Sequence, residues 1–538
     1  MIGAETETVH AAFEDTAARH PERGFLNVLP ETAEIYGIAA GEVTYAEAAR
    51  EVAALRKRIS AAGYLPGQRV MLLMENRPGF FLWWLALNGL GLSVVPVNPD
   101  LRAAELSYMI DHAEPVLAVA IPARGEDLRT AAQQAGRDMP VIAPEDPLPA
   151  PATRETIAAR QGGAEAALLY TSGTTGQPKG CILTNTYFLD AGRWYAGTGG
   201  LCALSEHGER MITPLPIFHM NAMAYSFMAM IAVGGCLTAL DRFHPRSWWA
   251  SVRASGATCL HYLGVMPSML MGAEESKADR DHAVRFGFGA GVDPKLHAAF
   301  EARFGFPLVE AWAMTETGAG AVICANREPR RVGESCLGAP EGGLEVRLLD
   351  DAGQEADQGE LLVRRSGADP RRGFFGGYFK NAEATDEAWA DGWFHTGDIV
   401  RRAPDGAMFF VDRKKNVIRR SGENIAAVEV ESTLMRHPAV AGAAVAAVPD
   451  AVRGDEVFAC IVPKDAGADP AALAQDITRW CLTQLAYYKA PGFIAFVEAL
   501  PLTATQKLQR GVLKTLAADL LNDPATQDLR GMKKRTAA

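Results

Sequence analysis

The chain of 538 residues is 48% hydrophobic and 22% charged, which is ordinary for a soluble globular protein and leaves room for several domains. Its formal net charge of −11, with no basic stretch to offset it, argues against nucleic acid as a partner. The eight cysteines stand singly, so their spacing favours buried thiols in a reducing, cytoplasmic compartment over a zinc site or a disulfide framework.

The first part of the chain alternates short apolar runs with alanine-rich amphipathic stretches. The runs at 69–73, 93–97, 116–119 and 140–143 predict strands, and the stretches at 45–62 and 103–113 predict helices. Such alternation is typical of parallel sheets covered by helices.

Neither the N-terminal residues nor the two long uncharged runs predict a targeting or membrane segment. The N-terminal residues are acidic and polar, unlike a signal peptide. The apolar run 80–95 is interrupted by Asn88, Gly89 and Gly91, and the uncharged run 222–240 is divided by a pair of glycines into a helix-like half and a strand-like half. Both runs therefore predict buried core, and no membrane contact is expected.

A loop rich in glycine and hydroxyl groups, YTSGTTGQPKG at 170–180, lies between two strand-like apolar runs at 166–170 and 181–184. Its backbone N–H groups, hydroxyls and Lys179 are suited to surround a phosphate chain. It differs from a Walker A loop, because Pro178 precedes the lysine and Gly180 follows it. A plain surface turn is disfavoured by the apolar runs on both sides.

Two further segments have nucleotide-binding character. A glycine-rich turn, FGFGAG at 286–291, is followed by EAWAMTETG at 310–318. There, Trp312 offers a ring to a purine, Thr315 a hydroxyl to a phosphate, and Glu316 a carboxylate to Mg²⁺. By itself, Trp312 fits core packing equally well.

After residue 340 the pattern changes to alternating polar and apolar residues. The runs 345–349 and 359–364 predict a small antiparallel sheet or barrel. The segment DGWFHTGD ends at Asp398 just past a Thr-Gly turn, where a carboxylate can accept both hydroxyls of a ribose.

A compact region begins at residue 412. It has helix-like stretches at 427–436 and 471–485 and strand-like runs at 440–448 and 456–463. Lys507 lies in a polar turn, a place where a lysine is usually solvated. We expect the last residues, 530–538, to form a mobile tail.

Five of these segments, in this order, resemble the adenylate-forming superfamily of acyl-CoA synthetases, peptide-synthetase adenylation domains and beetle luciferases. They are YTSGTTGQPKG, WAMTETG, GWFHTGD, DRKKNVIRRSGEN and PLTATQKLQR. The resemblance extends from about residue 10 to about residue 515. The motif sequences are most similar to those of the crotonobetaine/carnitine-CoA-ligase-like branch. The resemblance implies an α/β fold. It further implies a large N-terminal domain (1–411) with stacked, mostly parallel sheets, helices and a small β-barrel-like subdomain, followed by a small, mobile α+β C-terminal domain (412–538).

The resemblance also implies an enzyme that forms AMP in two half-reactions. A small-molecule carboxylic acid attacks the α-phosphate of ATP, with Mg²⁺ as metal, and the acyl group then passes to coenzyme A. Transfer to a carrier-protein pantetheine or another nucleophile, a luciferase-like oxygenase and a non-enzymatic binding protein are the alternatives. The short stretch after Lys507 holds no carrier domain, which favours free coenzyme A. The oligomeric state, monomer or homodimer, stays open.

By the same resemblance, the nucleotide site is assigned residue by residue. Thr315 contacts the α-phosphate and Glu316 binds Mg²⁺. Asp398, assisted by Arg413, holds the ribose, while Trp312 stacks on adenine where the family usually has Tyr. The β- and γ-phosphates are assigned to Thr171, Ser172, Gly173, Thr174, Thr175 and Lys179. Further nucleotide contacts are Gly289, Ala290, Gly291, Ala311, Ala313 (usually Gly in the family) and Met314.

The C-terminal domain is implied to rotate between the half-reactions about a hinge near Lys415. Lys507 is assigned to bridge the carboxylate and the α-phosphate in the first half-reaction. Its turn reads Thr-Gln-Lys where the family has Ser-Gly-Lys. Gly422 is assigned to the tunnel for the pantetheine thiol in the second.

For the acyl pocket, His219 resembles the aromatic gate of CoA ligases, with a structural histidine as its alternative. Amino-acid-activating relatives have Asp at this position, so an α-amino acid is not expected. Asn221 and His261 are candidates for polar contacts with the acid. A mainly apolar lining is expected from Met220, Met223, Tyr262 and Met266.

Overall fold

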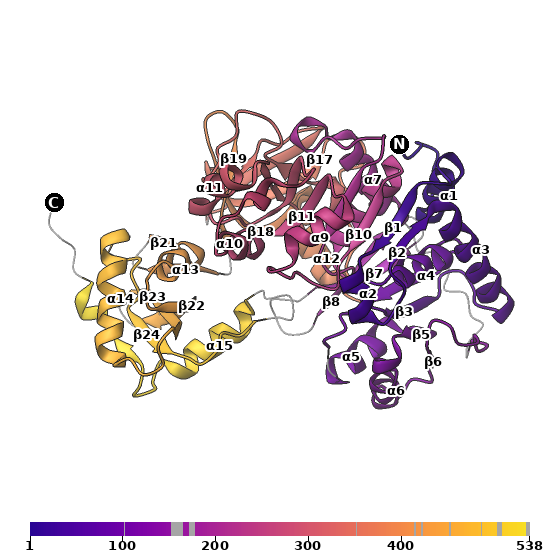
Figure 1. Ribbon diagram of the computed structural model, residues 1–538. Helices are drawn as coiled ribbons and strands as arrows, with labels where there is room; N and C mark the ends of the chain where they lie inside the picture. The colour runs from indigo at the N-terminus through magenta and orange to yellow at the C-terminus, as the bar shows by residue number, and fades with distance from the viewer. Residues whose placement is uncertain are drawn as a thin grey trace.

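The computed structural model describes residues 1–101, 103–151, 165–171, 178–350, 352–413, 416–420, 423–450, 453–485, 487–502 and 508–533. Within these ranges the chain forms four sheets. Three belong to a large N-terminal part, and the fourth lies in a smaller C-terminal part at the left of Figure 1. The predicted α/β class with a separate small domain is confirmed, whereas the exact boundary at 411/412 stays a prediction.

One sheet has six strands in the order β6-β5-β3-β4-β7-β8, all parallel except for the antiparallel pair β7–β8. Both faces are covered, because Val70 and Leu72 of β3 belong to one core cluster and Met71 and Leu73 to another. The strands are β3 (Arg69–Leu73), β4 (Ser93–Pro96), β5 (Leu117–Ala120), β6 (Val141–Ile142), β7 (Glu165–Thr171) and β8 (Lys179–Thr184). The helices that follow these strands are α4 (Pro78–Asn88), α5 (Ala103–Ala113), η1 (Pro122–Arg124), α6 (Gly125–Gln134) and α7 (Asn185–Gly197).

The second sheet has eight strands in the order β14-β13-β12-β11-β9-β10-β1-β2, parallel from β13 to β1 with an antiparallel strand at each edge. Its strands are β1 (Gly24–Val28), β2 (Gly41–Thr44), β9 (Arg210–Thr213), β10 (Cys236–Ala239), β11 (Cys259–Leu263), β12 (Phe286–Ala290), β13 (Leu308–Trp312) and β14 (Ile323–Cys324). Its helices are α1 (Val9–Arg19), α2 (Pro30–Tyr36), α3 (Tyr45–Ala62), η2 (Gly200–Cys202), η3 (Asn221–Ser226), α8 (Phe227–Val233), α9 (Trp248–Ser255), α10 (Val265–Met271), η4 (Lys277–Arg280), α11 (Pro294–Phe304) and η5 (Gly318–Gly320).

The two uncharged runs form buried core, as predicted, with a helix and then a strand in each: α4 and β4 in the first, α8 and β10 in the second. Every residue of α8 and all but the first two of α4 are buried, and both helices pack in the core cluster that joins the two sheets. Trp84 of α4 donates to the carbonyl of Ala166 in β7 at 3.3 Å, which ties the helix to the first sheet. In the part of the chain that the structure describes, no helix has the length and apolarity needed to cross a membrane.

The third sheet is antiparallel and open, in the order β15-β19-β18-β17-β16. The predicted barrel-like subdomain therefore has the expected strands but does not close, since within the described residues the edge strands β15 and β16 pair with one neighbour each. The strands are β15 (Cys336–Gly338), β16 (Leu344–Leu349), β17 (Gln358–Arg365), β18 (Phe394–Arg402) and β19 (Met408–Arg413), with α12 (Ala382–Ala388) and η6 (Ala390–Gly392) between β17 and β18.

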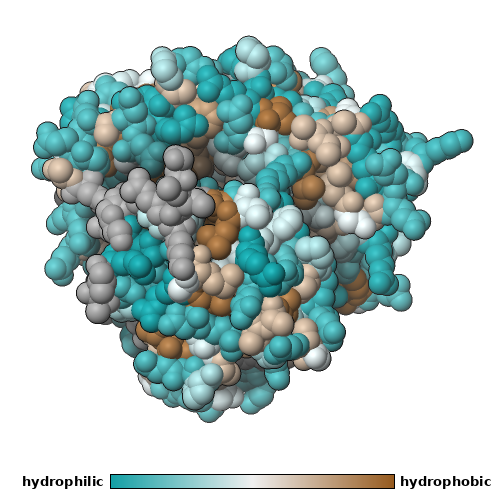
Figure 2. Space-filling view, turned by 90° about the vertical axis from the view of Figure 1, so that its left-hand side faces the viewer, coloured by the Kyte–Doolittle hydropathy of each residue, from teal (hydrophilic) through white to brown (hydrophobic). Residues whose placement is uncertain are grey.

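The C-terminal part has its own sheet, in the order β21-β20-β23-β24-β25 with β22 beside β23. Two core clusters, one on each face, are separate from those of the N-terminal part. The face that it turns outward is mostly hydrophilic, with scattered apolar residues (Figure 2). Its elements are β20 (Val417–Arg420), β21 (Glu423–Ala426), α13 (Ala427–Met435), β22 (Val440–Asp450), β23 (Gly454–Pro463), α14 (Pro470–Gln484), β24 (Phe493–Phe496), α15 (Arg510–Leu520), β25 (Gln527–Asp528) and η8 (Arg530–Met532).

The expectation of a mobile tail from residue 530 is wrong for its first residues. Residues 530–532 form a short helical turn, and the Lys533 ammonium is buried in an ion pair with Glu456. Glu456 also accepts from Arg420 at 2.9 Å, so the tail completes a buried charge cluster. A buried carboxylate needs such partners, and this requirement outweighs the polar composition of the segment. Residues 534–538 lie outside the described ranges.

Candidate active site

The predicted nucleotide segments meet at one edge of the eight-stranded sheet. The strands β9, β11, β12 and β13 are parallel, so their carboxyl ends lie at the same edge. Gly289 and Ala290 end β12 and Gly291 follows it, while Ala311 and Trp312 end β13 and Ala313 and Met314 come directly after it. The sheet thus brings together two segments that are about twenty residues apart in the sequence.

A buried carboxylate holds the glycine-rich turn against β13. Glu310 accepts from the backbone N–H of Gly291 at 3.0 Å and of Val292 at 2.8 Å. Burial raises the pKa of Glu310, and these two hydrogen bonds oppose the rise. Gly289 is required by space, because a Cβ there would lie 2.2 Å from the carbonyl oxygen of Tyr262. At the predicted turn, the backbone of β12 therefore approaches the backbone of Tyr262 closely.

Trp312, Asp398 and Arg413 form a connected group. The Trp312 indole N–H donates to Asp398 Oδ2 at 2.8 Å, and Arg413 Nε lies 3.1 Å from Asp398 Oδ1. Asp398 and Arg413 face each other across β18 and β19. Burial raises the pKa of Asp398, against the opposing effects of Arg413 and Trp312. Trp312 is 5% exposed, so it packs in the core and also serves as a polar partner.

Thr315 and Glu316 are held by two tyrosines. Tyr187 donates its hydroxyl to the Thr315 carbonyl at 2.9 Å, and Tyr378 donates to Glu316 Oε1 at 2.8 Å. The Lys179 ammonium lies 4.6 Å from the centre of the Tyr378 ring, in cation–π contact. One side chain thus connects the phosphate-loop lysine with the carboxylate predicted to hold the metal.

Sequence reasoning missed Tyr378. Its segment adds to β8 by backbone hydrogen bonds, from Gly376 to Ile182 at 2.7 Å and from Phe379 to Gly180 at 2.8 Å. The pattern Gly-Gly-Tyr-Phe at 376–379 was the available clue, because a tyrosine after two glycines can approach a neighbouring strand closely.

The phosphate loop joins two paired strands, since Thr171 ends β7 and Lys179 begins β8 directly opposite. The strand end at Lys179 lies near Glu316, because Tyr378 contacts both side chains. Several predicted residues lie outside the described residues. They are Ser172, Gly173, Thr174, Thr175, Lys415, Gly422 and Lys507.

The predicted acyl segments adjoin this group. His219 is partly exposed, and its ring centre lies 4.7 Å from that of Phe218. His261 is fully buried, and burial lowers its pKa to about 3, so it is a neutral member of the core. Its predicted contact with the acid is therefore indirect at most, whereas Asn221 is partly exposed beside it.

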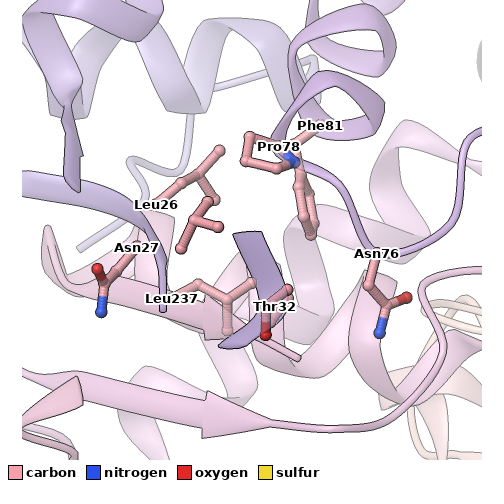
Figure 3. A pocket seen from close by; sticks show the side chains of 9 residues that line it. Leu26, Asn27, Thr32, Asn76, Pro78, Phe81 and Leu237 are labelled. Carbon is pink, nitrogen blue, oxygen red and sulfur yellow. The ribbon is translucent and has the colours of Figure 1, made fainter. Parts of the chain in front are cut away.

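Asn76 positions the loop that leads to His219. Its amide donates to the carbonyls of Leu215 and Leu240 at 3.0 and 2.7 Å and accepts from the Ile217 N–H at 2.8 Å. Behind it lies a small, mainly apolar pocket, shown in Figure 3. Its lining comprises Leu26, Asn27, Val28, Thr32, Asn76, Pro78, Phe81, Leu237 and Ala239. None of the predicted site residues lines it, so we assign this pocket to packing between the sheets.

Comparison with known proteins identifies two matching family models and several similar enzymes. The model of the family described as AMP-binding enzyme matches residues 13–379, and that of the AMP-binding enzyme C-terminal domain matches residues 429–507. A sulfoacetate–CoA ligase from Cupriavidus necator is 32% identical, over 94% of this chain and 97% of the relative. A crotonobetaine/carnitine–CoA ligase from Salmonella arizonae is 28% identical, over 90% of this chain and 96% of the relative.

Solved structures share the fold over nearly the whole chain. An anthranilate CoA ligase in complex with anthranoyl-AMP matches with a TM-score of 0.80 and 23% identity, over 96% of this chain and 98% of that one. ATP-bound MatB from Rhodopseudomonas palustris matches with a TM-score of 0.77 and 24% identity, over 95% and 99%.

Proposed function

The chain belongs to the family of AMP-binding enzymes, and from that membership we propose how its residues activate a carboxylic acid with ATP and pass the acyl group to a thiol. The protein is an ATP-dependent acid–CoA ligase, as its CoA-ligase relatives are. The acid's carboxylate attacks the α-phosphate, which gives acyl-adenylate and pyrophosphate. The coenzyme A thiol then attacks the acyl carbon, which gives acyl-CoA and AMP. We propose a cytoplasmic location, because the eight single cysteines favour buried thiols in a reducing compartment.

The observation that supports this proposal best is the pairing of Trp312 with Asp398. One oxygen of this buried carboxylate accepts from the indole. The other lies near Arg413 Nε, yet among the described residues it receives no well-aligned hydrogen bond. A buried carboxylate oxygen with spare acceptor capacity suits a ribose hydroxyl. We assign Asp398 to the ribose and the Trp312 ring to the adenine.

The other connected group would serve the phosphates. Negative charge develops on the leaving pyrophosphate, and a cation and preorganised donors stabilise it. We assign this work to Lys179 with the phosphate loop, and contact with the α-phosphate to Thr315.

The Glu316 carboxylate fits a magnesium ion. It is 8% exposed and a hard oxygen ligand, and Tyr378 donates to one of its two oxygens. Bound Mg²⁺ would neutralise charge on the phosphates. In that assignment Glu316 holds the ion and Tyr378 orients the carboxylate.

Lys507 and Gly422 are proposed to act in different half-reactions, the lysine in adenylation and the glycine in the thiol tunnel. Both lie outside the described residues, so these roles rest on the family motif.

The experiment that tests the function is a panel of carboxylic acids assayed for pyrophosphate release and for acyl-CoA, with and without coenzyme A. We expect release that requires both ATP and an acid, and acyl-CoA that forms only with coenzyme A. Asp398→Asn should raise the KM for ATP without changing which acid is preferred. Acyl transfer to a carrier-protein pantetheine but never to free coenzyme A would contradict the proposal that coenzyme A is the acceptor.

A further inference from the structure

A buried histidine holds one amide of the loop that follows β9. Asn221 begins the π-helical turn η3, and its Oδ1 lies 2.6 Å from Nδ1 of His261 in β11. The other ring nitrogen, Nε2, lies 2.9 Å from the hydroxyl of Tyr195. Ser226, at the end of the same turn, lies 2.9 Å from Nδ1. Both nitrogens of this fully buried ring are therefore engaged.

The amide oxygen of Asn221 faces His261, and this orientation assigns the histidine proton. An amide oxygen only accepts, so the His261 proton is on Nδ1, and Nε2 accepts from the Tyr195 hydroxyl. Because His261 is neutral in this surrounding, the arrangement carries no charge. The NH₂ group of Asn221 is left facing away from His261, and among the described residues it donates to no partner.

Through Tyr225, the turn η3 contacts both the segment of the predicted nucleotide residues and a group of aromatic rings. Tyr225, in the same turn, donates to the carbonyl of Gly318, two residues after Glu316, at 2.9 Å. Its ring packs 5.6 Å from Trp194 and 6.2 Å from Phe288. The five residues of the turn after Asn221 are buried, whereas Asn221 itself is partly exposed. Part of Asn221 is therefore accessible, as is part of His219, two positions before it. Single π-helical turns are frequent at functional sites.

We propose that Asn221 determines which acid is used, by donating its amide N–H groups to a neutral hydrogen-bond acceptor, a hydroxyl or carbonyl, on the chain of the acid. This inference rests on the proposed function. The acceptor is neutral because, among the described residues, no lysine or arginine makes a hydrogen bond to Asn221 or His261, and an anionic tail would be desolvated without a counter-charge. His261 is the positioning residue that keeps the donor side outward.

The test compares matched acids in the full-length enzyme. Pyrophosphate release is measured with butanoate, 3-hydroxybutanoate, 3-oxobutanoate, 4-aminobutanoate and 3-sulfopropanoate. We expect kcat/KM to favour the hydroxy or oxo acid over butanoate by about tenfold or more, since a site built to donate a hydrogen bond rejects an analogue that lacks the acceptor. Asn221→Leu should remove that preference, with the KM for ATP unchanged.

Two further variants separate the role from simple misfolding. Asn221→Ser keeps a donor and should retain part of the preference. His261→Phe leaves Asn221 in place without its partner and should weaken the preference by about 3–10-fold, as expected for one lost hydrogen bond.

An unchanged acid ratio in Asn221→Leu overturns the inference. So does a preference for 4-aminobutanoate, which needs the amide oxygen outward, or for 3-sulfopropanoate, which needs a cation. Absence of acid-dependent pyrophosphate release from the wild-type enzyme with every acid would contradict the proposed function instead.

Discussion

Trp312 has two proposed tasks in one residue, because its ring is assigned to the adenine and its N–H donates to Asp398. Trp312→Phe keeps an aromatic face and removes the donor, which leaves Asp398 Oδ2 without that partner. We expect the KM for ATP to rise about tenfold, the cost of one hydrogen bond to a charged group, with the KM for the acid unchanged. Steady-state kinetics with ATP and with 2′-deoxy-ATP measures it.

The control for Trp312 is a double-mutant cycle with Asp398→Asn. Coupling between the two substitutions is expected, because both act on the same ribose contact. Strictly additive effects would leave Trp312 with a stacking role only.

Tyr378 also makes two contacts that different substitutions can separate, one through its ring and one through its hydroxyl. Tyr378→Phe keeps the ring beside Lys179 and removes the hydroxyl that donates to Glu316. The Mg²⁺ concentration for half-maximal pyrophosphate release should rise about tenfold, as when a partner of a metal ligand is lost. Metal-free binding of ATP, measured by calorimetry, should stay as in the wild type.

Tyr378→Leu is the matched comparison for that experiment, since it also removes the ring from Lys179. It should weaken metal-free ATP binding, which Tyr378→Phe does not. A wild-type Mg²⁺ requirement in Tyr378→Phe would refute the assignment of Tyr378 to Glu316.

At the scale of elements, Glu301 of α11 hydrogen-bonds to β13, the strand that ends at Trp312, and pairs with Arg330. Both oxygens of Glu301 accept from Arg330, at 2.7 and 2.8 Å, and Oε1 also accepts from the Leu308 N–H at 2.8 Å. Burial raises the pKa of Glu301, but the hydrogen bonds from Arg330, His297 and Leu308 outweigh it and lower the pKa to about 2. The charged form is thus favoured in the folded protein.

The pH dependence follows from the direction of that shift. A carboxylate with a lowered pKa stabilises the fold above its unfolded value of about 4.5 and loses this contribution as the pH falls toward 2. Glu301→Gln should therefore lower the unfolding free energy at pH 7 by about 3 kcal/mol, and the difference should shrink below pH 4.5. Urea unfolding between pH 7 and 3.5 measures it.

The exposed Glu275 provides the matched control for α11 and β13, because Glu275→Gln removes the same charge without these partners. It should leave the urea midpoint within error at every pH. If Glu301→Gln lowers the unfolding free energy by the same amount at every pH, then the shape of the side chain, rather than its ionisation, holds α11 and β13 together.

At the scale of the whole molecule, the two parts have separate cores, which permits one to move against the other. Lys507→Ala should lower adenylation by about 100-fold or more, since its charge is proposed to stabilise the transition state of that step, and should spare thiolysis of supplied acyl-adenylate. Gly422→Trp should do the reverse. Pyrophosphate exchange and acyl-CoA formation separate the two half-reactions.

Lys514→Ala is the control, because this lysine is exposed on α15 and close to Lys507 in sequence. It should leave both half-reactions intact. Equal losses of both half-reactions in Lys507→Ala would contradict alternation between two arrangements of the C-terminal part.

Local patterns were sufficient for much of the fold. The helix predicted at 45–62 is α3, with a capping box between Thr44 and Glu47 at its start. The strand predicted at 69–73 is β3, buried on both faces as its unbroken apolar run indicates. Such features depend on neighbours in the sequence. The packed Lys533 depends on a distant partner, and there the expectation was wrong. The third sheet has the predicted antiparallel strands but does not close into a barrel.

The sequence alone determined the family, the two-part organisation and the kinds of side chain near the nucleotide, because the motifs are continuous and each brings its own chemistry. Only the tertiary structure decided how those side chains are paired. Trp312 and Asp398 are 86 positions apart, Tyr378 and Glu316 are 62 apart, and Asn221 and His261 are 40 apart. Such pairs form only where the sheets bring strand ends together, and burial there decides which groups are charged and which way each donor points.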